Sequence, residues 1–129
     1  MVGLHSGLAT VAPKTDAKTI KARVLVCIGG DDPFIPLEQR AGFEAEMRDA
    51  GVDWQLIVYG NTVHSFTNPT AANAKRPNAV RYSAEADKRS WKSMQDLFVE
   101  AFARVPIKTL PLKSRLTDAC DPLMRWPAK

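Results

Sequence analysis

Two aspartates and a histidine in this 129-residue chain follow the two stretches that look most like β-strands. Asp31 and Asp32 come just after the apolar run VLVCI, and His64 follows the run LIVY and a turn. Because doubly wound α/β folds bind ligands at the carboxyl ends of their strands, these side chains can meet at one rim of a parallel sheet. A carboxylate that orients a histidine, with the histidine as general base, is the acid–base half of a catalytic triad. The order acid, then histidine, is that of an α/β-hydrolase.

The same residues also allow a purely structural interpretation. Aspartates in a Gly-Gly-Asp-Asp turn often accept hydrogen bonds from nearby backbone N–H groups. A histidine before Ser-Phe-Thr can cap a turn. The residues alone leave the catalytic and the structural interpretation open.

The chain lacks the nucleophile turn that such a pair normally activates, since it contains neither G-x-C-x-G nor G-x-S-x-G. An α/β-hydrolase needs that turn, together with backbone N–H groups that form an oxyanion hole. The segment GLHSG, residues 3–7, comes near, and makes Ser6 the one conceivable substitute. A simple turn serine is the favoured interpretation of Ser6, and His5 is expected to be a loop residue near the site. Cys27 lies inside an apolar run, where a buried thiol is inert.

The elements that position these residues follow from the apolar pattern. Residues 24–28 predict a strand buried on both faces of a parallel sheet, and residues 53–60 predict the next strand. Between them, Pro36 can open a helix and Gly51 can close it. The unit predicts a right-handed βαβ arrangement. One face of its helix is expected to pack, through Leu37, Ala41, Phe43, Met47 and Ala50.

The rest of the chain predicts one more strand, one more helix and a tail. A short strand is expected at residues 2–4, a polar connection at 9–21 and a long irregular loop at 68–82. A second helix is expected from about Ser83 to about Arg104. Residues 1–105 would then form one partial α/β domain, and residues 106–129 a basic, proline-containing tail. The core stripe expected on the second helix is Trp91, Met94, Phe98 and Phe102.

Three segments in order resemble the C-terminal portion of the dienelactone hydrolase family: VLVCIGGDDPFIP, EAEMRDAGVDWQLIVYGNTVHSFTNP and YSAEADKRSWKSM. The resemblance covers about residues 2–104 and implies a truncated α/β-hydrolase-like piece with about three parallel strands. The family's triad acid lies in a G-x-x-D-x-F-[VI]-P turn and its base in an H-S-F segment, so the resemblance selects Asp32 rather than Asp31, together with His64. The family's nucleophile lies on a G-x-C-x-G-G turn that this chain lacks.

The resemblance implies an ester or lactone hydrolase that keeps the triad acid and base but is weak or inactive alone. The alternative is a non-catalytic, oligomeric binding or assembly module built on a hydrolase scaffold, with a small ester or lactone as a conceivable ligand. A bare sheet edge at residues 2–4 would invite pairing with a second copy, which predicts a homodimer. A third hypothesis is a basic adaptor that acts through the tail.

Composition limits the remaining classes. The chain has no apolar run long enough to cross a membrane and no recognisable signal peptide, so the cytoplasm is the expected location. The net charge is +4, but there is no nucleic-acid-binding motif, which makes a nucleic-acid partner an unfavoured hypothesis. Two histidines and scattered carboxylates have no metal-ligand spacing, and no cofactor is expected.

Overall fold

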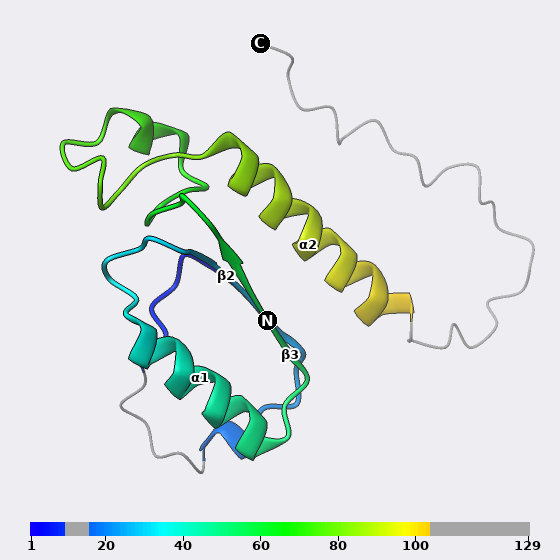
Figure 1. Cartoon of the computed structure of the whole chain (residues 1–129). Helices are drawn as coiled ribbons and strands as arrows, with labels where there is room; N and C mark the ends of the chain where they lie inside the picture. Colours follow the sequence, from blue (N-terminus) through cyan, green and yellow to red (C-terminus); the bar gives the residue numbers. More distant parts are fainter. Residues whose placement is uncertain (10–15, 104–129) are drawn as a thin grey trace, which may run out of the picture.

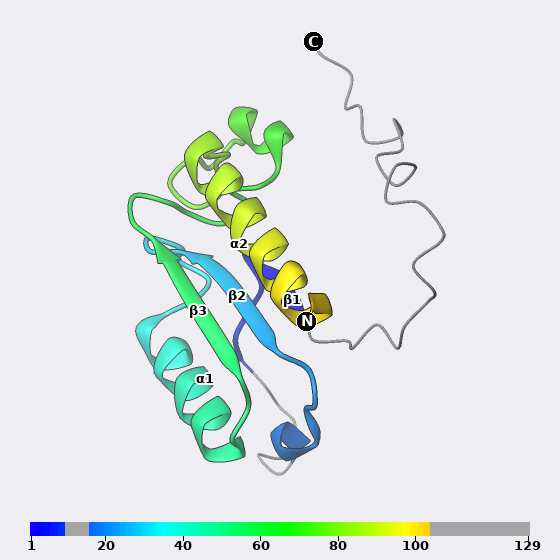
Figure 2. The same ribbon diagram turned by 90° about the vertical axis from the view of Figure 1, so that its right-hand side faces the viewer.

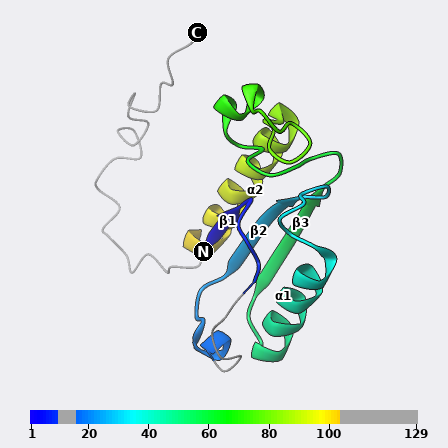
Figure 3. The same ribbon diagram turned by 90° about the vertical axis from the view of Figure 1, so that its left-hand side faces the viewer.

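Three parallel strands form a single sheet in the order β1-β2-β3. Figure 1 shows β2 and β3 lying between the two long helices. The computed structural model describes residues 1–9 and 16–103. The strands are β1 (Val2–Leu4), β2 (Val24–Gly29) and β3 (Trp54–Tyr59). Figure 3 shows β1 at one edge of the sheet and β3 at the other. The expected α/β piece with about three parallel strands is confirmed, whereas the expected tail at 106–129 lies outside the described residues.

The central strand β2 is buried along its whole length, as predicted. Strands flank it on both edges, and a helix packs on each face (Figure 2). Because side chains alternate along a strand, Val24, Val26 and Ile28 share a core with Phe43 of helix α1 (Leu37–Ala50). Leu25 and Cys27, on the other face, pack with residues of helix α2 (Ala84–Ala103). Two small cores therefore hold the sheet, one on each side.

Helix α1 has the predicted ends but not all of the predicted face. It starts after Pro36 and ends at Gly51, whose left-handed φ of 68° is the usual glycine helix stop. Phe43 packs edge to face on Trp54 of β3, with ring centroids 5.7 Å apart. Leu37, however, is 72% exposed, so its expected place in the packed face was wrong. Ile35, just before the helix, fills the core at this end.

Helix α2 begins one residue after the predicted start, because the Ser83 hydroxyl accepts the N–H of Ala86 as an N-terminal cap. The expected aromatic core stripe was largely wrong. Of the four residues, Met94 is partly buried against the core, while the three aromatic side chains are 41–69% exposed. The buried residues are instead Ala86, Ser90 and Leu97, and the small side chains of Ala86 and Ser90 let the helix lie close to the sheet.

Two connections contain short 3₁₀ helices in place of the irregular chain expected there. One spans Pro69–Asn73 and starts at Asn68, whose side chain accepts the N–H of Thr70. The other spans Asp16–Thr19, in the connection expected to be simply polar.

No helix in the described part of the chain is long and apolar enough to cross a membrane. The cytoplasmic location remains a prediction.

Candidate active site

The turn after β2 places one carboxylate inside the protein and the other outside. Asp32 is 4% exposed, whereas Asp31 is exposed to solvent. The Phe34 N–H donates to Asp32 Oδ1 at 2.9 Å, which is the local turn bond of the structural interpretation. Arg40 on α1 donates through Nη2 to the carbonyl oxygens of Gly29 and Gly30, at 3.2 and 2.9 Å. The turn is therefore anchored by its own backbone and by α1.

The segment after β3 holds His64 through its backbone. The His64 N–H donates to the Ala79 carbonyl and the His64 carbonyl accepts from the Arg81 N–H, both at 3.1 Å. Ser65 has a left-handed φ of 59°, which directs the chain back into the protein, where Phe66 is fully buried. We call residues 61–67 the base loop. Hydrogen bonds that do not involve the imidazole therefore hold its backbone in place.

The turn at the end of β2, residues 29–36, which we call the acid turn, and the base loop bring the two side chains together. His64 Nδ1 lies 2.9 Å from Asp32 Oδ2, with side chains 28% and 0% exposed, respectively. A carboxylate accepts but does not donate, so this contact places a proton on Nδ1 and leaves Nε2 as the basic nitrogen. Asp32 thus combines both interpretations left open by the sequence, since Oδ1 closes a turn and Oδ2 orients the histidine. The catalytic roles of Asp32 and His64 remain predictions.

Gly29 lets the two loops approach at backbone distance. A Cβ at this position would lie 2.3 Å from the Thr62 carbonyl oxygen, closer than any non-bonded contact allows. Next to it, the Gly30 N–H donates to the Tyr59 carbonyl oxygen at 2.7 Å, and the Asp31 N–H donates to the Thr62 carbonyl oxygen at 2.9 Å. The sequence predicted a turn at the Gly-Gly-Asp-Asp segment but not this contact of Gly29. A glycine pair directly after a buried strand was the available signal.

Two aromatic residues flank the histidine. The His5 ring lies edge to face with the His64 ring at a centroid distance of 5.1 Å, and Phe34 does the same at 5.3 Å. His5 is thus near the site, as expected. Phe34 had not been singled out.

The other nucleophile candidates lie elsewhere. Ser6 is exposed and lines a cavity of about 350 Å³ with Phe43 and Met47 of α1. Among the described residues it has no hydrogen bond to His64. Cys27 is fully buried, and burial raises the pKa of its thiol. The described residues 1–9 and 16–103 contain no group of three His, Cys, Asp or Glu side chains placed to hold a metal ion.

A buried carboxylate bonded to a histidine, at the carboxyl ends of neighbouring parallel strands, matches the arrangement of the acid and base in an α/β-hydrolase site. The model of the dienelactone hydrolase family matches residues 2–102. The chain therefore belongs to the dienelactone hydrolase family.

Several known proteins are similar to this chain. A promiscuous phosphotriesterase from metagenomic libraries, described as dienelactone hydrolase-like, is 41% identical with a TM-score of 0.69; the match covers 77% of this chain and 41% of that one. A solved structure designated m3DLH is 40% identical with a TM-score of 0.71, covering 77% and 40% of the two chains. An uncharacterized Caenorhabditis elegans protein is 44% identical over 61 residues, 47% of this chain and 38% of that protein. The chain spans about two-fifths of the length of these relatives.

Proposed function

We propose that this chain carries the acid–base half of an ester- or lactone-hydrolase site, with His64 as general base and Asp32 as the residue that orients it. The observation that supports this proposal is the 2.9 Å hydrogen bond between His64 Nδ1 and a carboxylate with 0% side-chain exposure. A buried carboxylate also stabilises the imidazolium that forms when His64 takes up a proton.

In this proposal, water attacks the ester directly. Nε2 of His64 takes a proton from water, and the water oxygen bonds to the carbonyl carbon of the ester. The bond from that carbon to the leaving oxygen then breaks, and Nε2 returns the proton to the leaving group. Removing the nucleophile of a complete serine-protease triad lowers kcat by about a million-fold, so hydrolysis by this half alone is slow.

Hydrolysis of p-nitrophenyl acetate tests the proposal. We expect a rate above that of free imidazole at equal concentration, and a loss of about tenfold or more in His64→Ala, because general-base catalysis is typically worth at least that much. Ser6→Ala is the control and should keep the wild-type rate. A p-nitrophenyl phosphotriester is a second substrate, since one similar protein is a promiscuous phosphotriesterase. Equal rates for wild type and His64→Ala would contradict the proposal and favour a non-catalytic binding module.

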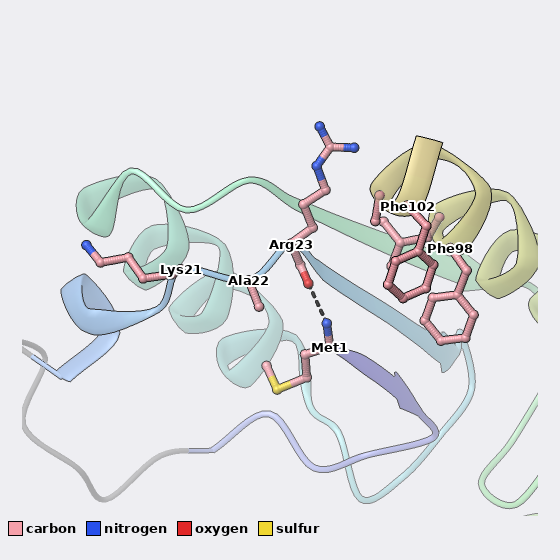
Figure 4. Close-up of a pocket in the computed structure, with 8 residues that line it drawn as sticks. Met1, Lys21, Ala22, Arg23, Phe98 and Phe102 are labelled. Carbon is pink, nitrogen blue, oxygen red and sulfur yellow. Dashed lines mark hydrogen bonds between the residues drawn. The ribbon is translucent and has the colours of Figure 1, made fainter. Parts of the chain in front are cut away.

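We also propose that the chain pairs with a second copy through the outer edge of β1, which no strand of the described residues 1–9 and 16–103 covers. Met1 and His5 bond to β2, so in a parallel ladder the main-chain groups of Val2 and Leu4 point away from it. An identical edge on a second copy satisfies these groups around a two-fold axis. Apolar surface adjoins this edge: Phe98 and Phe102 are 41% and 69% exposed, and line a cavity of about 370 Å³ with Met1. Figure 4 shows both rings projecting from α2 beside Met1.

Light scattering at micromolar concentration tests the pairing. We expect a dimeric mass for the wild type. Phe102→Glu should weaken the dimer about tenfold, or about 1.4 kcal/mol, because it places a charge in apolar surface beside the edge. Trp91→Glu is the matched control, since Trp91 is 54% exposed on the same helix but lines a different cavity. A monomeric wild type, or equal effects of both variants, would contradict pairing at β1.

A further inference from the structure

We propose that His5 is a positioning residue that holds the His64 imidazole against Asp32. The inference deepens the proposed function and rests on it, because it concerns the same base. It depends on the way in which β1, the acid turn and the base loop converge on one ring.

The end of β1 directs His5 toward the base loop. The His5 N–H donates to the Cys27 carbonyl at 2.8 Å, so the residue continues the ladder with β2. Its φ of 44° is left-handed, a conformation that is uncommon for residues other than glycine. Such a backbone persists only where surrounding contacts hold it. At His5 those contacts are the backbone bond to Cys27 and the side-chain contacts with the base loop.

Three base-loop residues contact the His5 side chain. Its ring lies edge to face with His64 at 5.1 Å and with Phe66 at 5.6 Å. Its Nε2 lies 3.0 Å from Thr67 Oγ1, within hydrogen-bond distance. The ring thus contacts the loop through a hydrogen bond at Nε2 and through two edge-to-face ring contacts. This arrangement fixes the His5 ring relative to the loop that carries His64.

The rings of His5 and Phe34 both contact the His64 ring edge to face. Phe34, from the acid turn, lies edge to face with His64 at a centroid distance of 5.3 Å and an interplanar angle of 88°. A single hydrogen bond to Asp32 leaves an imidazole free to swing about its side-chain torsions. Ring contacts from two other elements oppose that swing and keep Nδ1 directed at the carboxylate.

His5 suits this place because it remains neutral near pH 7. Burial lowers the pKa of His5, and the neighbouring His64 lowers it further, outweighing the opposite effects of a backbone hydrogen bond at His5 and of Asp32. These two groups are the titratable neighbours that act on it, one from the base loop and one from the acid turn. A neutral neighbour does not repel the positive charge that His64 acquires when it accepts a proton.

NMR of the His64 ring tests the proposal without requiring activity. The chain has two histidines, so each His5 variant leaves one imidazole to observe. His5→Asn removes the ring but suits a left-handed backbone. We expect the His64 Nδ1–H to exchange with water about tenfold faster in this variant, because weaker positioning opens the hydrogen bond more often. His5→Phe restores an edge-to-face ring and should return exchange toward the wild-type rate, and Ser6→Ala should leave it unchanged.

A second variant tests the same contact if His5→Asn does not fold. Thr67→Val removes the hydroxyl at the edge of the His5 ring and keeps the side-chain shape, and should speed exchange about threefold. Wild-type exchange rates in His5→Asn, or in Thr67→Val if His5→Asn does not fold, would overturn the positioning role. Failure of the proposed function is a different result: the wild type would then show no esterase rate, whatever the NMR of these variants.

Discussion

Replacing Asp32 with asparagine should move the proton of neutral His64 from Nδ1 to Nε2. The asparagine oxygen can still accept the Phe34 N–H, so the turn keeps its local bond. The amide nitrogen then faces His64 Nδ1 and, as a donor, favours an unprotonated Nδ1. The basic lone pair would lie on the buried side, and the nitrogen facing the substrate would carry a proton.

Nitrogen-15 NMR of the imidazole reads this change directly. We expect the Nδ1–H form in the wild type and the Nε2–H form in Asp32→Asn. Asp31→Asn is the matched control, because the exposed neighbour contacts the base loop through its backbone and should leave the tautomer unchanged. The same exchange in a complete triad lowers kcat about 10⁴-fold, so any His64-dependent esterase rate should fall about tenfold or more. An unchanged tautomer in Asp32→Asn would contradict the assigned pairing.

Replacing Gly29 with alanine should produce the largest loss of stability among the substitutions considered. The added Cβ would meet the Thr62 carbonyl oxygen at 2.3 Å and the Val63 carbonyl oxygen at 2.9 Å. These are backbone atoms, so neither can move aside by rotating a side chain. Overpacking of a core costs about 1–3 kcal/mol and sometimes more, and we expect about 3 kcal/mol here. The acid turn and the base loop must separate to relieve the contact, so the Asp32–His64 bond should lengthen as well.

Urea unfolding followed by circular dichroism measures this loss. Gly42→Ala is the matched control, because nothing lies within 4 Å of the added Cβ and the position is exposed inside α1. Alanine is the better helix residue there, so this variant should gain about 0.5–1 kcal/mol. Equal effects of the two variants would show that Gly29 is not a close-approach position.

The strands and helices could be predicted correctly because each depends on the residues of its own segment. The run at residues 24–28 is apolar at every position, which a strand satisfies when both of its faces are covered. Helix α1 begins after Pro36 and ends before Gly51, as the backbone preferences of proline and glycine require. The stripe on α2 failed because size was taken as the guide to burial. Apolar residues lie on more than one face of that helix. The face that packs on the sheet is the one whose side chains let the helix come closest to it.

The sequence by itself determined the strands, the two long helices and the rim at which a carboxylate and a histidine must lie, because these follow from hydrophobic periodicity and from residues with restricted backbones. Only the tertiary structure decided that Asp32 points inward to His64 while Asp31 faces solvent, and that Gly29 lies against the Thr62 carbonyl. It also placed the His5 ring against the base loop. These contacts join segments far apart in the chain. No local preference encodes such distances, which arise only when the sheet and both loops pack together.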